Sequence, residues 1–123
     1  MNFNGFAINS GDVIKLTVTA TSTTSGSAVI ENLTSGQQVS KDITSRSALC
    51  LENAEWIVED YEENGKLVPL TDFGTVAFTN AFATTTSGSQ ISPNGATIID
   101  MEQNGKILTS VSESSSGVSI TYQ

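Results

Sequence analysis

The chain lacks histidine entirely and has a single cysteine among its 123 residues. The absence of histidine excludes catalytic triads and metal sites that depend on imidazole. The single thiol, Cys50, excludes an intrachain disulfide and a cysteine-based metal cluster. No glycine-rich phosphate loop or serine-elbow motif is present. We therefore expect no cofactor and no metal ion.

Basic residues are also scarce, with five Lys and Arg against 13 Asp and Glu, for a net charge of −8. We expect no nucleic-acid partner, because phosphate binding requires clustered Lys and Arg. No apolar run approaches membrane-spanning length, so no membrane association is expected. The start of the chain, residues 1–5, lacks the basic and apolar regions of a signal peptide.

Charged residues make up only 15% of the chain, whereas Ser, Thr, Gly and Asn are plentiful. Such a bias can indicate disorder, but apolar residues still reach 37% and recur in alternation. The combination is typical of a secreted β-protein. The combination also suits an acidic environment. Below about pH 4 most carboxylates are neutral, and the five basic residues then give the chain too little positive charge for strong self-repulsion.

Short alternating segments separated by turn signals run the length of the chain. We find no amphipathic helix and no internal repeat. Asn104-Gly105 is the strongest hairpin signal and predicts a type I′ turn; Asn64-Gly65 is a second such signal. The pattern predicts one all-β domain over residues 1–123, an antiparallel β-sandwich. The expected strands are 12–21, 28–33, 38–43, 54–61, 66–70, 74–84, 96–103, 106–112 and 117–122.

The most informative segment is 53–63, which places carboxylates inside a run that otherwise predicts a half-buried strand. Alternation directs Ala54, Trp56, Val58 and Asp60 to one face, with Trp56 as a core anchor. The other face receives Glu55, Ile57, Glu59 and Tyr61. A carboxylate in mid-strand costs free energy unless it is solvated, paired or used chemically. The residues alone leave a solvated face and a functional acid both open.

Several segments together resemble the glutamic peptidases, the fungal eqolisin family of acid endopeptidases. The resemblance covers essentially the whole chain but corresponds only to the C-terminal portion of the family's catalytic domain. The residues that carry it are Asn53 to Glu63, Leu67-Val68-Pro69-Leu70, Phe73 to Asn80, Ile14 to Ser22 and Glu31 to Gln37.

The resemblance implies an acid endopeptidase that hydrolyses polypeptide substrates by direct attack of water, without a cofactor. Its fold would be a concanavalin-like double sheet whose concave face holds the site. The catalytic glutamate of the family falls on Glu59, which would act as general base. Tyr61 would form a cleft wall, with Glu55 and Ile57 on the same face. The family location is secreted.

The family's second catalytic group is a glutamine whose amide stabilises the oxyanion. The resemblance places that glutamine N-terminal to the part represented here. Five other glutamines are interpreted as surface polar residues: Gln37, Gln38, Gln90, Gln103 and Gln123. Activity is therefore expected to be lost or impaired. The alternative is a non-catalytic β-sandwich fragment that binds peptide or carbohydrate.

A sandwich without its N-terminal strands would have unpaired edges and uncovered apolar faces. We therefore expect self-association, by dimerisation or strand swapping, or complementation by a separate N-terminal portion. The resemblance implies that Cys50 is half of a disulfide to that portion; otherwise Cys50 would be a small buried apolar residue. Asn32-Leu33-Thr34 matches the N-glycosylation pattern.

Overall fold

The computed structural model describes residues 5–123, and these contain strands and turns but no helix. Every strand pairing is antiparallel, which confirms the all-β antiparallel class. No described segment forms a helix that is long and apolar enough to cross a membrane. The chain divides into two compact units, Met1–Asn53 and Ala54–Gln123. The single domain over residues 1–123 stays a prediction.

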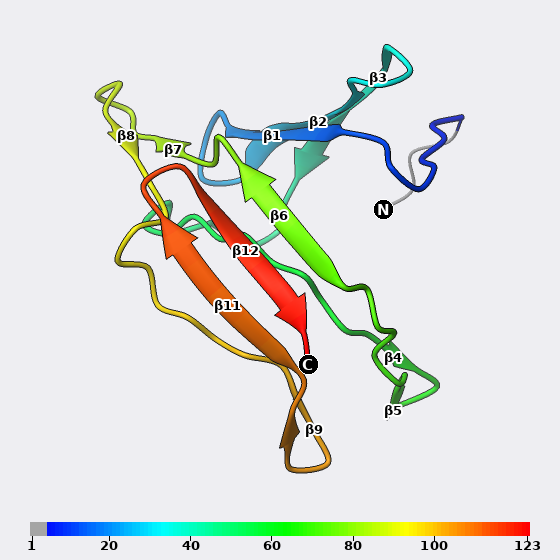
Figure 1. Cartoon of the computed structure of the whole chain (residues 1–123). Coiled ribbons are helices and arrows are strands. Elements are labelled where there is room, and N and C mark those ends of the chain that lie inside the picture. Colours follow the sequence, from blue (N-terminus) through cyan, green and yellow to red (C-terminus); the bar gives the residue numbers. More distant parts are fainter. Residues whose placement is uncertain (1–4) are drawn as a thin grey trace. The chain divides into compact units, whose positions relative to one another are not determined.

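The first unit is built on a three-stranded sheet of β1 (Ile14–Ala20), β2 (Ser25–Asn32) and β3 (Gln37–Thr44), in the order β1-β2-β3 (Figure 1). The sequence predicted these three strands to within three residues at each end. Leu16 pairs with Ile30, which pairs with Val39, so one face is apolar. The opposite face is polar, and there Lys15 Nζ lies 2.6 Å from Glu31 Oε2.

Asn32 closes β2 and is buried, with only 1% of its surface exposed. Its Oδ1 accepts hydrogen bonds from the backbone N–H groups of Thr34 and Ser35, both at 3.0 Å. Its Nδ2 donates to Asp12 Oδ2 at 2.7 Å and to the carbonyl of Ala7 at 3.3 Å. The folded chain therefore does not present this amide for N-glycosylation, although the local sequence matches the pattern.

Asp12 is the acceptor that joins this turn to the start of the sheet. The backbone N–H of Asn9 donates to its Oδ2 at 2.8 Å, and Asn32 donates to the same atom. These two bonds, that from Asn9 first, lower the pKa of the Asp12 carboxyl below its ordinary value of 3.8. The carboxylate is thus the form that the fold favours.

The second unit contains a three-stranded sheet in the order β11-β12-β6, formed by Thr109–Ser114, Gly117–Tyr122 and Thr75–Thr79 (Figure 1). Val118 pairs with Phe78 and Ile120 with Val76, so the apolar residues share one face. Ile120, on the central strand, is buried. A Cβ on Gly117 would lie 2.2 Å from the carbonyl oxygen of Phe78, so the close pairing of β12 with β6 requires glycine.

The prediction of one long strand over 74–84 is wrong, because the structure has two shorter strands there. Asn80 has a φ of 53° and interrupts it, leaving β6 and a short β7 (Ala83–Thr84). Left-handed backbone cannot continue a ladder, and asparagine tolerates it better than most residues. The segment 85–95, predicted as loop, contains β8 (Gln90–Ile91), which pairs with β7.

The predicted strands over 54–61 and 96–103 are also largely absent. Residues 54–61 carry no strand pairing among the described residues, and only Glu102–Gln103 (β9) is a strand in the second range. A strand is defined by hydrogen bonds to a neighbour, and alternation in sequence does not supply that neighbour. Likewise, the range 106–112 divides into β10 (Lys106–Ile107) and β11.

Two short hairpins repeat nearly the same six-residue sequence 40 positions apart. The first joins β4 (Glu62–Glu63) to β5 (Lys66–Leu67), and the second joins β9 to β10. Their sequences are Glu-Glu-Asn-Gly-Lys-Leu and Glu-Gln-Asn-Gly-Lys-Ile. Positive φ at both turn residues confirms the type I′ turn predicted for the second; the residues are Asn64, Gly65, Asn104 and Gly105.

Candidate functional site

Residues 54–61 alternate in burial even though they pair with no described strand. Trp56, Val58 and Asp60 are half-buried, as expected for the inward face; Ala54, predicted to join them, is exposed. The outward set is exposed in full, with Ile57 at 59% and Tyr61 at 64%. The outward residues are those predicted: Glu55, Ile57, Glu59 and Tyr61.

The inward side of this segment is held at Asp60 by Gln103. The Gln103 side-chain Nε2 donates to Asp60 Oδ2 at 3.1 Å and to the carbonyl oxygen of Val68 at 3.1 Å. The backbone N–H of Val68 also donates to the carbonyl of Tyr61 at 3.0 Å. These bonds close the base of the β4–β5 hairpin directly after Glu59.

Gln103 is thus the residue that our sequence reasoning missed, because it was interpreted as a surface polar side chain. It is half-buried, and both hydrogens of its amide are used. The repeat at 40 positions could have drawn attention to it. In that repeat the equivalent of Gln103 is the exposed Glu63, so the second hairpin carries an amide where the first carries a carboxylate.

Carboxylates dominate the segment, and cations are few. Lys66 is the cation nearest in sequence, and it pairs in register with Glu63 across the hairpin. Within residues 5–123, no three His, Cys, Asp or Glu side chains are grouped so that they could hold a metal ion. The five acids of the segment are Glu55, Glu59, Asp60, Glu62 and Glu63.

An exposed carboxylate such as Glu59 can accept a proton from water, which is the role of a general base. Hydrolysis of a peptide bond also needs a donor toward the developing oxyanion. In the unit 54–123, the amide of Gln103 is committed to Asp60 and Val68, and Gln90 and Gln123 are exposed. The partner amide implied by the resemblance is not found in this unit.

Cys50 is exposed and carries a free thiol, so the interpretation as a small buried apolar residue is wrong. Its neighbour Leu51 has a φ of 58°, which is uncommon for a residue other than glycine or asparagine. The pairing of Cys50 with another polypeptide stays a prediction.

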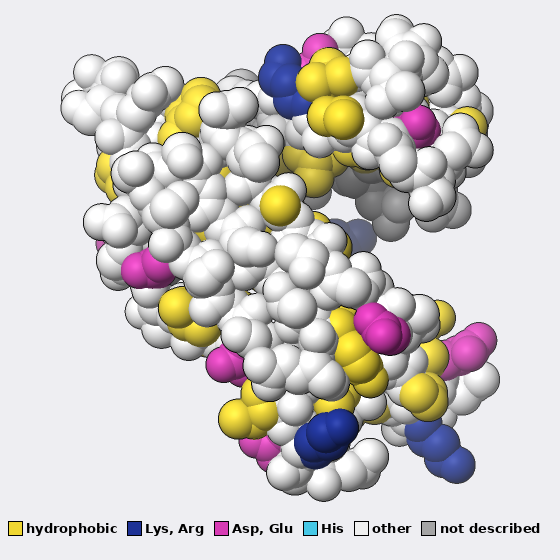
Figure 2. All heavy atoms as spheres, viewed as in Figure 1, with side chains coloured by type: hydrophobic (Ala, Val, Ile, Leu, Met, Phe, Trp, Pro, Cys, Tyr) yellow, Lys and Arg dark blue, Asp and Glu magenta, His cyan; other side chains and the backbone are white. Residues whose placement is uncertain are grey.

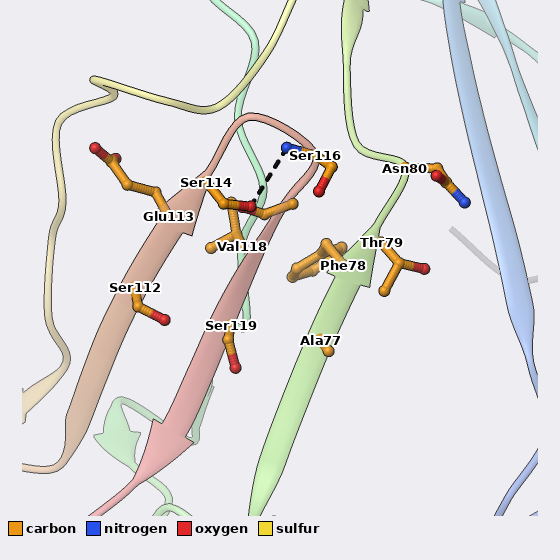
Figure 3. A pocket seen from close by; sticks show the side chains of 11 residues that line it. Ala77, Phe78, Thr79, Asn80, Ser112, Glu113, Ser114, Ser116, Val118 and Ser119 are labelled. Carbon is orange, nitrogen blue, oxygen red and sulfur yellow. Dashed lines mark hydrogen bonds between the residues drawn. The ribbon is translucent and has the colours of Figure 1, made fainter.

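A shallow hollow of about 260 Å³ lies over the end of the β11-β12-β6 sheet (Figure 3). Small polar side chains from all three strands surround it, among them Thr79, Ser112 and Ser119. Glu113 also lines it; its Oε1 accepts from the N–H of Gly95 at 2.8 Å. The hollow includes none of the predicted site residues, and the one carboxylate that lines it accepts from a backbone N–H rather than from one of these hydroxyls.

Charged side chains are sparse on the surface, as expected from the low charged fraction of the sequence. Most of the face visible in Figure 2 is backbone or uncharged polar side chain, with acidic, basic and apolar side chains scattered over it. No large basic area is seen on this face.

Comparisons with known proteins converge on one family. A model of the peptidase A4 family matches residues 1–122. Aspergillopepsin-2 of Aspergillus niger is 50% identical over 123 residues, which cover 98% of this chain and 43% of that protein. Scytalidopepsin B of Scytalidium lignicola is 43% identical over 130 residues, covering 98% of this chain and 50% of that protein. The chain thus spans about half the length of these relatives.

Solved structures give the same result. The crystal structure of aspergilloglutamic peptidase from Aspergillus niger superposes with a TM-score of 0.92 at 50% identity, covering 98% of this chain and 72% of that one. Scytalido-glutamic peptidase with a peptide-based transition state analog gives 0.86 at 41% identity, covering 96% and 62%. The chain is thus similar to these peptidases in both sequence and backbone fold, and the β-sandwich class is consistent with this similarity. The chain therefore belongs to the peptidase A4 family, the glutamic peptidases or eqolisins.

Proposed function

We propose that this chain contributes the general base to a glutamic endopeptidase that cleaves polypeptides in acid, and that the base is Glu59. The observation that carries the proposal is the placement of Glu59. Its side chain is exposed on the outward face, while half-buried Trp56, Val58 and Asp60 hold the other face. The family match over residues 1–122 supports the reaction class.

The chemistry requires that Glu59 take a proton from a water molecule as that water attacks the peptide carbonyl. Exposure leaves the carboxylate accessible to water and to a substrate. Ile57 and Tyr61 share its face and offer apolar and phenolic surface to a substrate side chain, while Glu55 adds negative charge. A neutral amide supplied by another polypeptide would stabilise the oxyanion at any pH.

The test is cleavage of a quenched fluorescent protein substrate at acid pH. The chain is assayed alone and mixed with a polypeptide covering the part of aspergillopepsin-2 that it does not span. We expect turnover in the mixture and little in the chain alone, because removing an oxyanion donor costs about 10²–10³ in kcat. Separately, we expect this protein to be secreted, as the family resemblance implies.

Glu59→Gln is the decisive variant, since it keeps the size of the side chain and removes the base. Turnover should fall by about 10²–10⁴. The matched control is Glu55→Gln, two positions away on the same face, which should retain most of the activity. Equal turnover of the wild type and Glu59→Gln would refute the assignment.

A non-catalytic role is the second candidate, and one observation favours it. Residues 54–61 carry no strand pairing among the described residues, so their backbone could pair with an extended peptide as an added strand. Saturable peptide binding without any turnover, in the chain and in the mixture, would support this role. Carbohydrate binding stays a prediction, and retention on a sugar column would test it.

A further inference from the structure

The orientation of the Glu59 side chain depends on how the segment around it is held. Most strands hold their side chains by a ladder on one or both edges, but residues 54–61 have no ladder among the described residues. The direction of the Glu59 side chain therefore depends on the anchoring of its neighbours. Trp56 and Val58 provide packing, and Asp60 provides the hydrogen bond nearest to Glu59.

The donor in that hydrogen bond is an amide with two hydrogens and two different acceptors. One hydrogen goes to Asp60 Oδ2 and the other to the carbonyl of Val68, each at 3.1 Å. The two acceptors lie at opposite ends of the first hairpin, eight positions apart in sequence. Gln103 thus ties the side-chain carboxylate of Asp60 to the backbone at Val68, directly after the strand that returns from the turn.

The chemical nature of residue 103 is also restrictive. The equivalent residue in the first hairpin is Glu63. A carboxylate at position 103 would face the acidic side chain of Asp60 and could not donate a hydrogen bond when ionised. A cation would place a new charge beside the segment of Glu59. The neutral amide donates at every pH, and it does so whether Asp60 is charged or neutral.

We propose that Gln103 is a positioning residue for Glu59, acting through its hydrogen bonds to Asp60 and Val68. The inference rests on the proposed function of Glu59 as general base. Gln103 does not touch substrate; it holds the segment so that the Glu59 carboxylate keeps the geometry that proton transfer needs. A misplacement of about 1 Å at a reacting group can cost about 10²-fold in rate.

The first test uses Gln103→Leu, which removes both donors and keeps a similar volume. In the cleavage assay of the mixture, we expect kcat to fall about 10- to 100-fold with KM little changed. The matched control is Gln90→Leu, since Gln90 is an exposed glutamine on β8 of the same unit. Unchanged kcat in Gln103→Leu would overturn the proposal.

The second test uses Gln103→Glu and its pH profile, and Gln90→Glu is its control. At mildly acidic pH, two carboxylates would oppose each other and kcat should fall as in Gln103→Leu. At lower pH the introduced carboxyl group is protonated and can donate to Asp60, so the deficit relative to wild type should shrink as pH falls. A deficit independent of pH would indicate a purely structural role and overturn the proposal.

A third measurement separates this inference from the proposed function. Backbone and Glu side-chain NMR resonances report the environment of Glu59 in the chain itself, without any turnover. If Gln103→Leu remains folded, we expect resonances at residues 59–61 and 68 to shift. We also expect the Val68 amide, which donates to the carbonyl of Tyr61, to lose exchange protection. Shifts without any Glu59-dependent cleavage would refute the proposed function but retain the positioning by Gln103. Unshifted resonances at 59–61 would refute the positioning.

Discussion

At the scale of single residues, side-chain amides that are buried or half-buried connect separate segments of this chain. Asn32 joins a turn to Asp12 and Ala7, and Gln103 joins two ends of a hairpin. An amide both donates and accepts without a charge, so its bonds do not depend on its own titration. Such connectors suit a protein with few bases, no histidine and a sequence pI near 4.1.

Asp12 gives a pH-dependent prediction at this scale. Its pKa is lowered in the folded chain, so its contribution to stability is complete above the ordinary value of 3.8 and is lost as pH falls through the folded value. In Asp12→Asn, the stability deficit relative to wild type should be largest above that value. The deficit should shrink as the solution becomes more acidic.

Thermal unfolding from about pH 6 to pH 2 measures this difference. The control is Asp42→Asn, because Asp42 is an exposed acid on β3 of the same unit. A deficit that grows in acid would contradict the role given to Asp12.

At the scale of elements, the two Asn-Gly hairpins show how much local sequence decides. Type I′ turns need positive φ at both central residues, and asparagine and glycine supply it at little cost. Gly65 and Gly105 have φ values of 73° and 75°. Both hairpins form with strands of only two residues each, so turn chemistry rather than ladder length specifies them.

Replacement of either turn glycine should therefore destabilise its hairpin through the backbone alone. No heavy atom lies within 4 Å of a Cβ built at Gly65 or Gly105, so there is no steric clash to add. Gly105→Ala and Gly65→Ala should each cost about 1–2 kcal/mol. Urea unfolding followed by fluorescence of Trp56, the only tryptophan, measures the loss.

Gly117→Ala is the contrasting variant, because its new Cβ would lie 2.2 Å from the Phe78 carbonyl oxygen. Its cost should exceed that of either turn variant, since backbone atoms cannot move aside easily. A smaller loss in Gly117→Ala than in Gly105→Ala would count against the tight pairing of β12 with β6.

At the scale of the whole molecule, exposed apolar surface is the most prominent feature. Leu16 and Val18 on β1 are 60% and 79% exposed, and they lie on the apolar face of their sheet. β1 is also an edge of that sheet, and one side of its backbone has no strand partner among the residues that the structure describes. An edge strand with exposed apolar side chains favours association. We propose that a second copy, or the part of the relatives that this chain does not span, covers it.

Light scattering of the chain alone tests self-association. We expect a mass of twice 12.9 kDa or more for the wild type and a shift toward the monomer in Val18→Lys, which places a charge on the apolar face. Thr17→Ser, a conservative change on the opposite face of the same strand, should leave the mass unchanged. A monomeric wild type at all concentrations would exclude self-association, and complementation alone would remain.

The sequence by itself determined the features that depend on nearest neighbours. Alternation located β1, β2, β3 and β12, and Asn-Gly located the second hairpin, because face periodicity and turn chemistry are local. Alternation over residues 54–61 also predicted the exposed face that carries Glu59, although Ala54, assigned to the inward face, is exposed as well. The resemblance identified the family, which the comparisons confirm.

Only the tertiary structure decided what depends on distant partners. It showed that 54–61 pairs with no described strand, that Asn80 divides the long predicted strand, and that Asn32 is buried in its own turn. It also brought Gln103 to Asp60, a contact across 43 positions. Hydrogen bonds between segments far apart in sequence leave no periodic signal, so a glutamine bound to a neighbouring segment and one on the surface look the same in sequence.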